Sequence, residues 1–239
     1  MTEILWELAN LSAQTMSELS FLSTHGLVKT NLAERLRLEI VNGSLAPGER
    51  IVEGKWAARF GVAQGSIREA INILAQDGFI TKESGRSARV IHLSEADVAH
   101  LYDLRGAIEG LAARLAAETQ PDFSGLQTAV HNMREAALAR NREHLLDCDL
   151  QFHLELCRLS QNPYVIEHAR RILLPFFAFV RMRVTTSGQE TSVWDKDLEA
   201  HQRIVDLLRD GDGEVAEYYV KRAMARFGKT AYDHWERRA

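Results

Sequence analysis

Apolar residues at helical spacing predict two short helices between residues 27 and 61. Leucine, isoleucine and valine recur every three to four residues after Leu27, and the run stops at Asn42-Gly43, where glycine favours a left-handed helix cap. A second run, from Glu53 to Phe60, keeps this spacing and ends at Gly61. Both helices are therefore expected to end at a glycine.

A third short helix follows after a glycine-centred turn. Its apolar stripe consists of Ile67, Ala70, Ile71 and Leu74. Gly65-Ser66 is the expected N-cap, Glu69 completes a capping-box pattern, and Asp77-Gly78 ends the helix. Two helices joined by such a turn are typical of a helix-turn-helix motif.

The pattern then changes twice along the chain. Residues 79–82 and 88–91 are rich in β-forming side chains and are joined by a polar turn, which predicts a hairpin, or wing. Over residues 94–237 the apolar spacing is helical, with breaks that leave about six helices and no convincing strand. We therefore predict a mostly α protein. A winged helix-turn-helix covers residues 27–92, an all-helical bundle follows it, and residues 1–26 form an N-terminal extension that is expected to be helical.

The charge of the chain is unevenly distributed. The 239 residues carry a net charge of −4, whereas residues 27–92 hold ten Lys/Arg and seven Asp/Glu, which leaves this segment at +3 and the remainder at −7. The mild overall charge excludes a polybasic nucleic-acid coat and a disordered acidic tail. The local positive excess agrees with phosphate binding by the first domain.

The sequence also indicates where the protein acts. Cys148 and Cys157 lie nine residues apart in one predicted helix, a spacing that turns them to different faces and argues against a disulfide. No window approaches the roughly 20 apolar residues that span a bilayer, and the N-terminus lacks a signal-peptide pattern. We therefore expect a cytoplasmic protein that does not contact a membrane.

The third helix has the features of a recognition helix. Its apolar stripe faces the domain core, so its N-terminal end and outer face can enter the major groove of DNA. Arg68 can donate two hydrogen bonds to a guanine edge or bind a phosphate, and Gln64 can pair with adenine. The expected DNA-binding residues are Lys55, Gln64, Gly65, Ser66, Arg68 and, at the tip of the wing, Arg86. The alternative is that both arginines are ordinary solvated surface residues.

Residues 27–90 resemble the winged helix-turn-helix of the GntR family of bacterial repressors. The matching positions are Gly43, Pro47-Gly48, Ala57, Gly61-Val62, Arg68-Glu69-Ala70, Leu74 and Gly78. Two positions depart from the family pattern: Ala63-Gln64 stands where the family has Ser-Arg, and Ser87 replaces the wing glycine. The first change puts a neutral side chain in place of an expected DNA contact, which can shift operator preference or weaken affinity.

The helical domain resembles the effector-binding domain of the FadR branch of this family, called FCD, over residues 94–227. Its first helix carries the branch's Leu-Arg-x-x-Ile-Glu pattern with Arg105 and Glu109. The resemblance implies a small-molecule effector in this domain. The other matching positions are Asp149, His153, Asn162, His201 and Gly211-Asp212.

Part of a divalent-metal site can be expected in the helical domain. Asp149 and His153 are four residues apart and share a helix face, and His201 from another helix can complete a set of ligands for an ion such as zinc. Branch members that hold a metal usually supply another histidine in the last helix, and Ala223 takes that place here. Three alternatives stay open: a three-ligand site completed by water, recruitment of Asp197, or an empty site. The Asp–His pair can also be a plain buried hydrogen bond.

Two arginines are candidates for contact with the effector. The Arg105 guanidinium can clamp the carboxylate of an organic acid, and Arg181 can line the same cavity. The predicted effector site combines them with the metal ligands: Arg105, Asp149, His153, Arg181 and His201. The alternatives are an ion pair between Arg105 and Glu109 and a solvent-facing Arg181.

These features predict a DNA-binding transcriptional regulator and not an enzyme. We expect a homodimeric repressor that binds an inverted-repeat operator in double-stranded DNA, with its affinity controlled by an organic or sugar acid in the helical domain. One alternative is a regulator that responds to an acyl thioester without a metal. The other is a metal-dependent hydrolase, although no recognisable general base, nucleophile or oxyanion donor accompanies the metal-ligand candidates.

Overall fold

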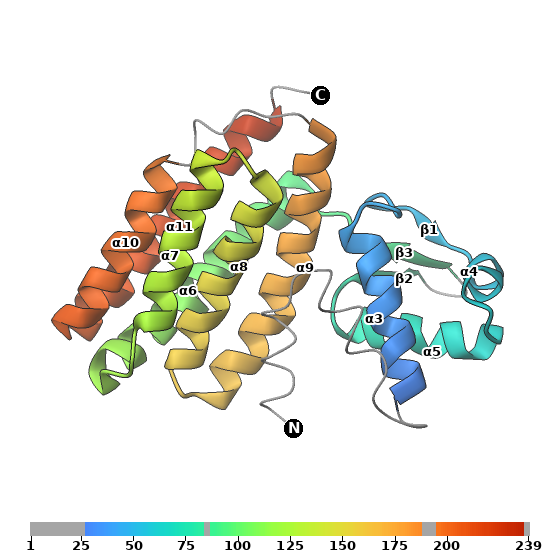
Figure 1. The fold of residues 1–239 in the computed structure, drawn as a ribbon, viewed down its shortest axis with the longest axis horizontal. Coiled ribbons are helices and arrows are strands. Elements are labelled where there is room, and N and C mark those ends of the chain that lie inside the picture. The colour runs from blue at the N-terminus through green and yellow to red at the C-terminus, as the bar shows by residue number, and fades with distance from the viewer. Residues whose placement is uncertain (1–26, 84–86, 188–194, 237–239) are drawn as a thin grey trace. The chain divides into compact units, whose positions relative to one another are not determined.

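Two compact units make up the computed structural model of the chain, and the division falls after His92 (Figure 1). The structure describes all residues except 1–26, 84–86, 188–194 and 237–239. The predicted N-terminal extension lies in the first of these excepted ranges. Within the described residues the protein has nine helices and three short strands, so the predicted mostly α fold class is confirmed.

Three helices form the body of the first unit: α3 (Leu27–Val41), α4 (Glu53–Phe60) and α5 (Gln64–Gln76). Their apolar faces meet in a core whose most buried large members include Leu36, Ile40, Trp56, Ile67 and Leu74. The chain leaves α4 through Gly61, whose φ of 67° lies in the left-handed region. Gly43, beyond the end of α3, has a φ of 75°. Both glycines thus adopt the left-handed conformation at the positions where the sequence pattern predicts a helix end.

Helix α5 begins one turn earlier than the sequence pattern predicts. Its N-cap is Ala63 and no side chain caps it, so the capping box expected between Ser66 and Glu69 is wrong. The Ser66 amide donates to the Ala63 carbonyl at 3.0 Å, which places Ser66 inside the first turn. The left-handed conformation of Gly61 already reverses the chain after α4. Helix α5 can therefore begin at Gln64, three residues after Gly61, without a capping serine.

The wing is part of a small three-stranded antiparallel sheet. The strands are β1 (Arg50–Ile51), β2 (Ile80–Glu83) and β3 (Ser87–Val90), in the order β1-β3-β2. Ile80 pairs with Val90, and Ile51 pairs with Ala88. These four side chains are buried, so the sheet packs one face on the helical core.

Six helices form the second unit within the described residues: α6 (Glu95–Thr119), α7 (Ser124–Leu138), α8 (Arg142–Leu159), α9 (Pro163–Ser187), α10 (Asp195–Asp210) and α11 (Gly213–Glu236). This number agrees with the prediction. The first of them is capped by Ser94, whose side chain accepts a bond from the Asp97 amide while the Asp97 carboxylate accepts from the Ser94 amide. Among all helices in the described ranges, none is both long and apolar enough to cross a lipid bilayer.

Helix α8 occupies a central place in this bundle and contacts α6, α7 and α9 (Figure 1). Helix α10 contacts α6, α7 and α11. The closest packing joins α6 to α11, because a Cβ atom added at Gly110 would lie 3.1 Å from the Lys221 side chain. Residues that face inward from α6, α8 and α10 therefore meet inside one bundle.

Candidate DNA-binding surface and metal centre

The outer face of α5 presents polar side chains to solvent. Gln64, Gly65 and Arg68 are exposed and Ser66 is half-buried, whereas the apolar stripe of the same helix is buried. The Arg68 side chain keeps 60% of its surface accessible. The arginine is thus not packed inside the domain, and its outward position meets the requirement for contact with a DNA groove.

The Arg68 guanidinium is held by Glu53 from the neighbouring helix α4. Arg68 Nε lies 3.1 Å from Glu53 Oε1, and an Arg68 Nη atom lies 2.8 Å from Glu53 Oε2. The hydrogen bond from Arg68 lowers the pKa of Glu53 below its usual range and outweighs the opposing effect of burial. Such a two-point contact fixes the orientation of the guanidinium while its remaining edge faces outward. The sequence offers no sign of this pair, because it depends on how α4 packs against α5.

Other predicted DNA-binding positions lie close to this pair. A Cβ atom added to Gly54 would come within 2.7 Å of Gln64 Nε2, so the missing side chain of Gly54 leaves the space that Gln64 uses. Lys55 is exposed on α4. Arg86, expected at the tip of the wing, lies outside the described residues. DNA contact by all these residues stays a prediction.

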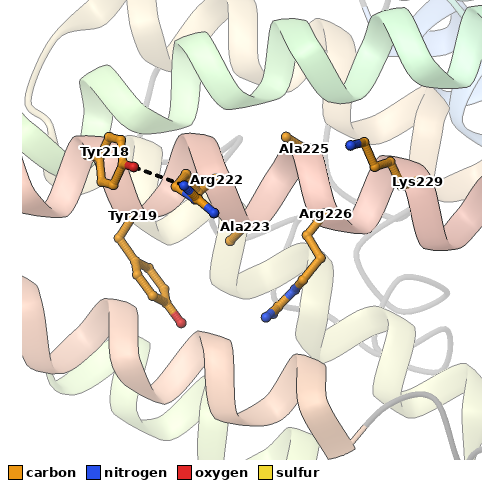
Figure 2. Close-up of a pocket in the computed structure, with 7 residues that line it drawn as sticks. All are labelled: Tyr218, Tyr219, Arg222, Ala223, Ala225, Arg226 and Lys229. Carbon is orange, nitrogen blue, oxygen red and sulfur yellow. Dashed lines mark hydrogen bonds between the residues drawn. The ribbon is translucent and has the colours of Figure 1, made fainter.

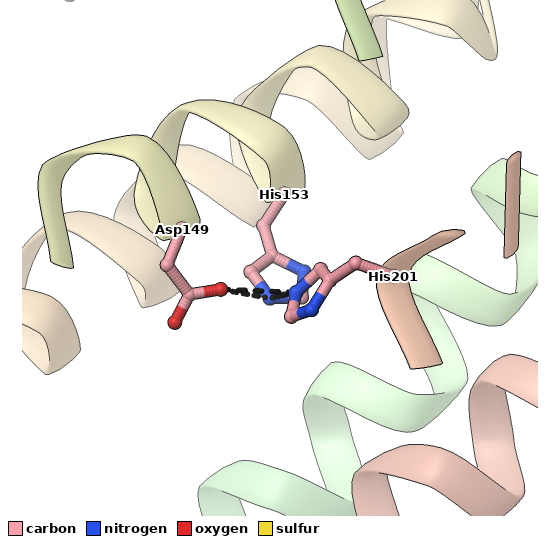
Figure 3. Close-up of side chains that lie close together, drawn as sticks. All are labelled: Asp149, His153 and His201. Atoms are coloured by element: carbon pink, nitrogen blue, oxygen red, sulfur yellow. Dashed lines mark hydrogen bonds and ion pairs between the residues drawn. The ribbon is translucent and has the colours of Figure 1, made fainter. Parts of the chain in front are cut away.

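In the helical unit, three predicted metal ligands converge (Figure 3). Asp149 Oδ1 lies 3.1 Å from His153 Nε2 and 3.0 Å from His201 Nε2. The two Nε2 atoms are 3.4 Å apart. Helix α8 supplies the first two residues one turn apart, and α10 supplies the third. Both histidines are buried.

A divalent cation fits these donor atoms. Tetrahedral zinc with bonds of about 2.1 Å holds its ligand atoms roughly 3.4 Å apart, which is close to the separations seen here. Asp149 Oδ1 is buried and has no hydrogen-bond partner of acceptable geometry despite its two close nitrogen neighbours. The three ligand atoms lie within 4.8 Å of one another, as ligands of a common ion must. Burial raises the pKa of Asp149, but the adjacent imidazoles outweigh this effect and lower it below its usual range.

Glu109 of α6 orients one of the histidines. Its Oε2 lies 2.5 Å from His153 Nδ1, which leaves Nε2 of the same ring directed at Asp149. A carboxylate on the far nitrogen is the usual means of fixing a metal-binding imidazole. Burial raises the pKa of Glu109, yet the charges of Arg105 and His153 lower it to about 2. The sequence identified Glu109 only as a possible partner of Arg105, because its contact with α8 is tertiary.

The predicted effector arginines are both engaged in ion pairs. Arg105 is buried, and its Nε donates to Glu109 Oε1 at 2.7 Å, as the alternative interpretation expected. Its guanidinium also lies over the rings of Tyr102, Phe176 and Phe177. Arg181 pairs with Asp147 and Glu143 of α8 at 2.5 and 2.9 Å. Neither ion pair includes a residue of the Asp–His–His cluster, and effector contact by either arginine stays a prediction.

The last helix supplies an aromatic ring near this cluster. The Phe227 ring stacks on His201 with centroids 6.4 Å apart. Ala223, which stands where the family resemblance implies a histidine, is buried one turn earlier. The side chain of Asp197 lies outside the described part of α10. Within the described residues, the candidate metal centre thus has three protein ligands.

Comparison with known proteins assigns both units. Residues 28–90 match the gntR family of bacterial regulatory proteins, and residues 100–226 match the FCD domain. The transcriptional repressor RspR of Escherichia coli K12 is 32% identical over 76% of this chain and 79% of its own length. The gluconate operon transcriptional repressor of Bacillus subtilis is 25% identical over 76% and 75%. The structure of E. coli McbR/YncC gives a TM-score of 0.73 at 16% identity over 90% of this chain and 100% of that one, which shows the fold alone.

Fold and sequence thus define a bacterial-type transcriptional regulator. The chain belongs to the GntR family and carries an FCD domain behind its DNA-binding domain. Its relatives are transcriptional regulators and not enzymes, which confirms the regulator prediction over the hydrolase alternative. The GntR domain implies DNA binding, and the FCD domain implies a small-molecule effector.

Proposed function

We propose that this protein is a metabolite-controlled repressor that acts in the cytoplasm. Its N-terminal domain binds operator DNA through Gln64, Gly65, Ser66 and Arg68, assisted by Lys55 and Arg86. A small organic or sugar acid in the helical domain changes the affinity for the operator. The names of two relatives, a gluconate operon repressor and RspR, support a repressor, and the first supports a sugar acid.

One observation carries the metabolite half of the proposal. Three ligand atoms of Asp149, His153 and His201 converge inside the helical domain of a chain whose other domain exposes Arg68. A divalent ion such as zinc on these atoms would supply positive charge for the carboxylate of an acid. Glu109 would hold the His153 ring in place, and Arg105 would keep Glu109 ionised.

We further propose that the protein binds DNA as a homodimer. One recognition helix reads only a few base pairs, whereas two related by a two-fold axis read both halves of an inverted repeat. Half-sites one or more DNA turns apart would match this symmetry. Ligand binding would then act by changing the population of dimers whose two recognition helices fit that spacing.

The test combines metal analysis with DNA binding. Zinc affinity is measured by titration calorimetry on metal-stripped protein, and operator affinity by electrophoretic shift on the promoter of its own gene at fixed salt. We expect His153→Ala to lose zinc binding and the response to effector while it keeps operator binding. If the protein gives no sequence-selective shift at any concentration, the proposal that it is a regulator is wrong. Salt-dependent binding to DNA of any sequence would not rescue it.

A metal-free regulator that responds to an acyl thioester is the second candidate. It is favoured by Ala223, which leaves the cluster one histidine short of the set implied by the family resemblance. Acyl-coenzyme A that raises the melting temperature of metal-stripped protein, together with no measurable zinc binding, would favour this candidate. A native-state ligand must raise the melting temperature by mass action.

A further inference from the structure

The outward face of α5 carries a second polar side chain beyond Arg68. Asn72 lies four residues after Arg68, so the two side chains share one face of the helix and are one turn apart. Asn72 is half-buried, whereas Ile71 beside it is buried in the domain core. The face that the proposed function assigns to DNA thus extends a full turn beyond Arg68.

Lys82 reaches Asn72 from the wing. Strand β2 contacts α5, and its Ile80 is buried against the helical core. Side chains two residues apart on a strand point to the same face of a sheet, so Lys82 lies on the helical side as well. Its ammonium group donates to Asn72 Oδ1. This contact therefore joins the recognition helix to the wing.

Arg68 and Asn72 are each held by a charged residue of another element. Glu53 of α4 binds the Arg68 guanidinium at 3.1 and 2.8 Å, and Lys82 of β2 binds the Asn72 amide. The two supports also act on each other. The hydrogen bond from Arg68 lowers the pKa of Glu53 most, and the positive charge of Lys82 lowers it further. The four side chains therefore form one polar patch built from α4, α5 and β2.

Support from another element differs from support within one helix. On α11, Arg222 donates at 3.0 Å to Tyr218, which lies one turn earlier on the same helix (Figure 2). Such a bond forms without any packing between elements. A bond from a second element instead fixes a side chain relative to the whole domain, as a precise base contact requires.

The contact with Lys82 decides which end of the Asn72 amide faces away from the wing. A lysine ammonium group has three donors and no acceptor, so only the amide oxygen can face it. The amide nitrogen, with its two donors, is then directed away from Lys82. Asparagine recognises adenine with both ends of its amide, because N6 of the base donates and N7 accepts. Lys82 therefore favours bases that present acceptors, namely guanine and thymine, over adenine.

The spacing along α5 sets the distance between the two base contacts. Four residues of an α-helix span about 6 Å, and successive base pairs are about 3.4 Å apart. A recognition helix that lies along the major groove thus places Asn72 about two base pairs from Arg68.

We propose that Asn72 is a second base-contacting residue of the recognition helix and that Lys82 is its positioning residue. Asn72 donates to the acceptor edge of guanine or thymine, about two base pairs from the guanine that Arg68 contacts. Lys82 holds the amide oxygen and so disfavours adenine at this base pair. The proposal rests on the proposed function and adds a determinant of operator specificity to it.

The test selects preferred sequences from a library of random double-stranded DNA, with the full-length protein at fixed salt. Selections are run on the wild type, Asn72→Ala, Lys82→Met and Lys82→Arg, and Arg68→Gln marks the base pair that Arg68 contacts. Lys229→Met is the matched control, because it removes the charge of an exposed lysine on α11 of the other unit (Figure 2). Melting temperatures verify that each variant is folded.

We expect Asn72→Ala to lose the preference at one base pair, about two positions from the one that Arg68→Gln affects. Discrimination there should fall roughly 3- to 10-fold, as for the loss of one hydrogen bond. Lys82→Met should raise the share of adenine at that base pair by a similar factor. Lys82→Arg keeps a cation that only donates and should preserve the wild-type preference, and so should the control.

A double variant separates the positioning role from a direct one. If Lys82 acts through Asn72, adding Lys82→Met to Asn72→Ala should not change the base preference any further. A direct phosphate contact by Lys82 would instead weaken binding to all sequences alike and reduce the salt dependence, with the preference unchanged. That result would overturn the positioning role, and an unchanged preference in Asn72→Ala would overturn the base contact.

The outcome is separable from that of the proposed function. A wild-type protein that selects no motif from the library would contradict the proposed operator binding itself. If the wild type selects a motif that neither Asn72→Ala nor Lys82→Met alters, the proposed function stands and only this determinant of specificity is wrong.

Discussion

The two candidate sites of this protein hold their charges in opposite ways. In the DNA-binding unit, Arg68 is exposed and pairs with one carboxylate at the surface. In the helical unit, Arg105, Glu109 and His153 form a chain of contacts in which every member is buried. Exposed ion pairs contribute little to stability, whereas a buried charge that loses its partner is costly. Removal of a charged partner should therefore cost much more stability in the helical unit than in the DNA-binding unit.

The largest expected effect tests the buried chain of charges. Arg105→Ala should lower the free energy of unfolding by about 3–5 kcal/mol, because it leaves the Glu109 carboxylate buried without its cation. Urea denaturation measures this change. The matched control is Arg171→Ala on α9, which removes an exposed pair with Glu167 and should cost at most about 0.5 kcal/mol. If both variants lose the same free energy of unfolding, buried and exposed ion pairs do not differ in this protein as expected.

The next effect concerns how Glu109 positions its histidine. Glu109→Gln should weaken zinc binding about 10- to 100-fold, because the His153 ring loses the carboxylate that directs Nε2 to the centre. Calorimetry on the variant, with circular dichroism to confirm folding, gives the number. A folded variant with wild-type zinc affinity would show that the Glu109 contact is structural only.

At the DNA surface, Arg68→Gln and Lys55→Gln should separate specificity from general affinity. Loss of a base contact by Arg68 should cost about 1–3 kcal/mol on the operator and little on random DNA. A phosphate contact by Lys55 would weaken both alike and reduce the salt dependence. Both changes should lower the melting temperature only slightly, since both side chains are exposed and an exposed ion pair contributes little to stability. A parallel loss on operator and random DNA in the Arg68 variant would contradict base contact.

The smallest expected effect is the titration of Glu53. Its pKa lies below the usual value of 4.5 in the folded protein because of the hydrogen bond from Arg68. The stabilising contribution of this pair is therefore complete above pH 4.5 and is lost as the pH falls through the lowered pKa. Carboxyl chemical shifts recorded against pH should show this low value, and Arg68→Gln should return it toward 4.5. An unchanged titration in the variant would disprove the assigned cause.

The sequence predicted much of this structure where the signal is local. Glycine at the helix ends, the apolar stripe of α5 and the four-residue spacing of Asp149 and His153 are each set by neighbours along the chain. The capping box at Ser66 was wrong, although its motif is local, because the turn at Gly61 starts the helix earlier. Other features depend on packing that no spacing encodes.

Two such features decide the sites. The contact of Glu109 with His153 joins α6 to α8, 44 positions apart in the numbering of the chain. The pair of Glu53 with Arg68 joins two helices across the glycine-centred turn. Resemblance to a family indicated the metal ligands and included Glu109 in its motif, but it gave neither of these two contacts. Both contacts depend on how the helices pack against one another.

The empty space beside Gly54 couples two positions of the DNA-binding surface. A side chain on that residue would meet the amide of Gln64, and the flexible Gln64 side chain would have to move aside. A larger residue at position 54 therefore limits the conformations that a long side chain at position 64 can adopt. As long as Gly54 is kept, position 64 can hold side chains of different length, so we expect operator preference to diversify there without a change in α4.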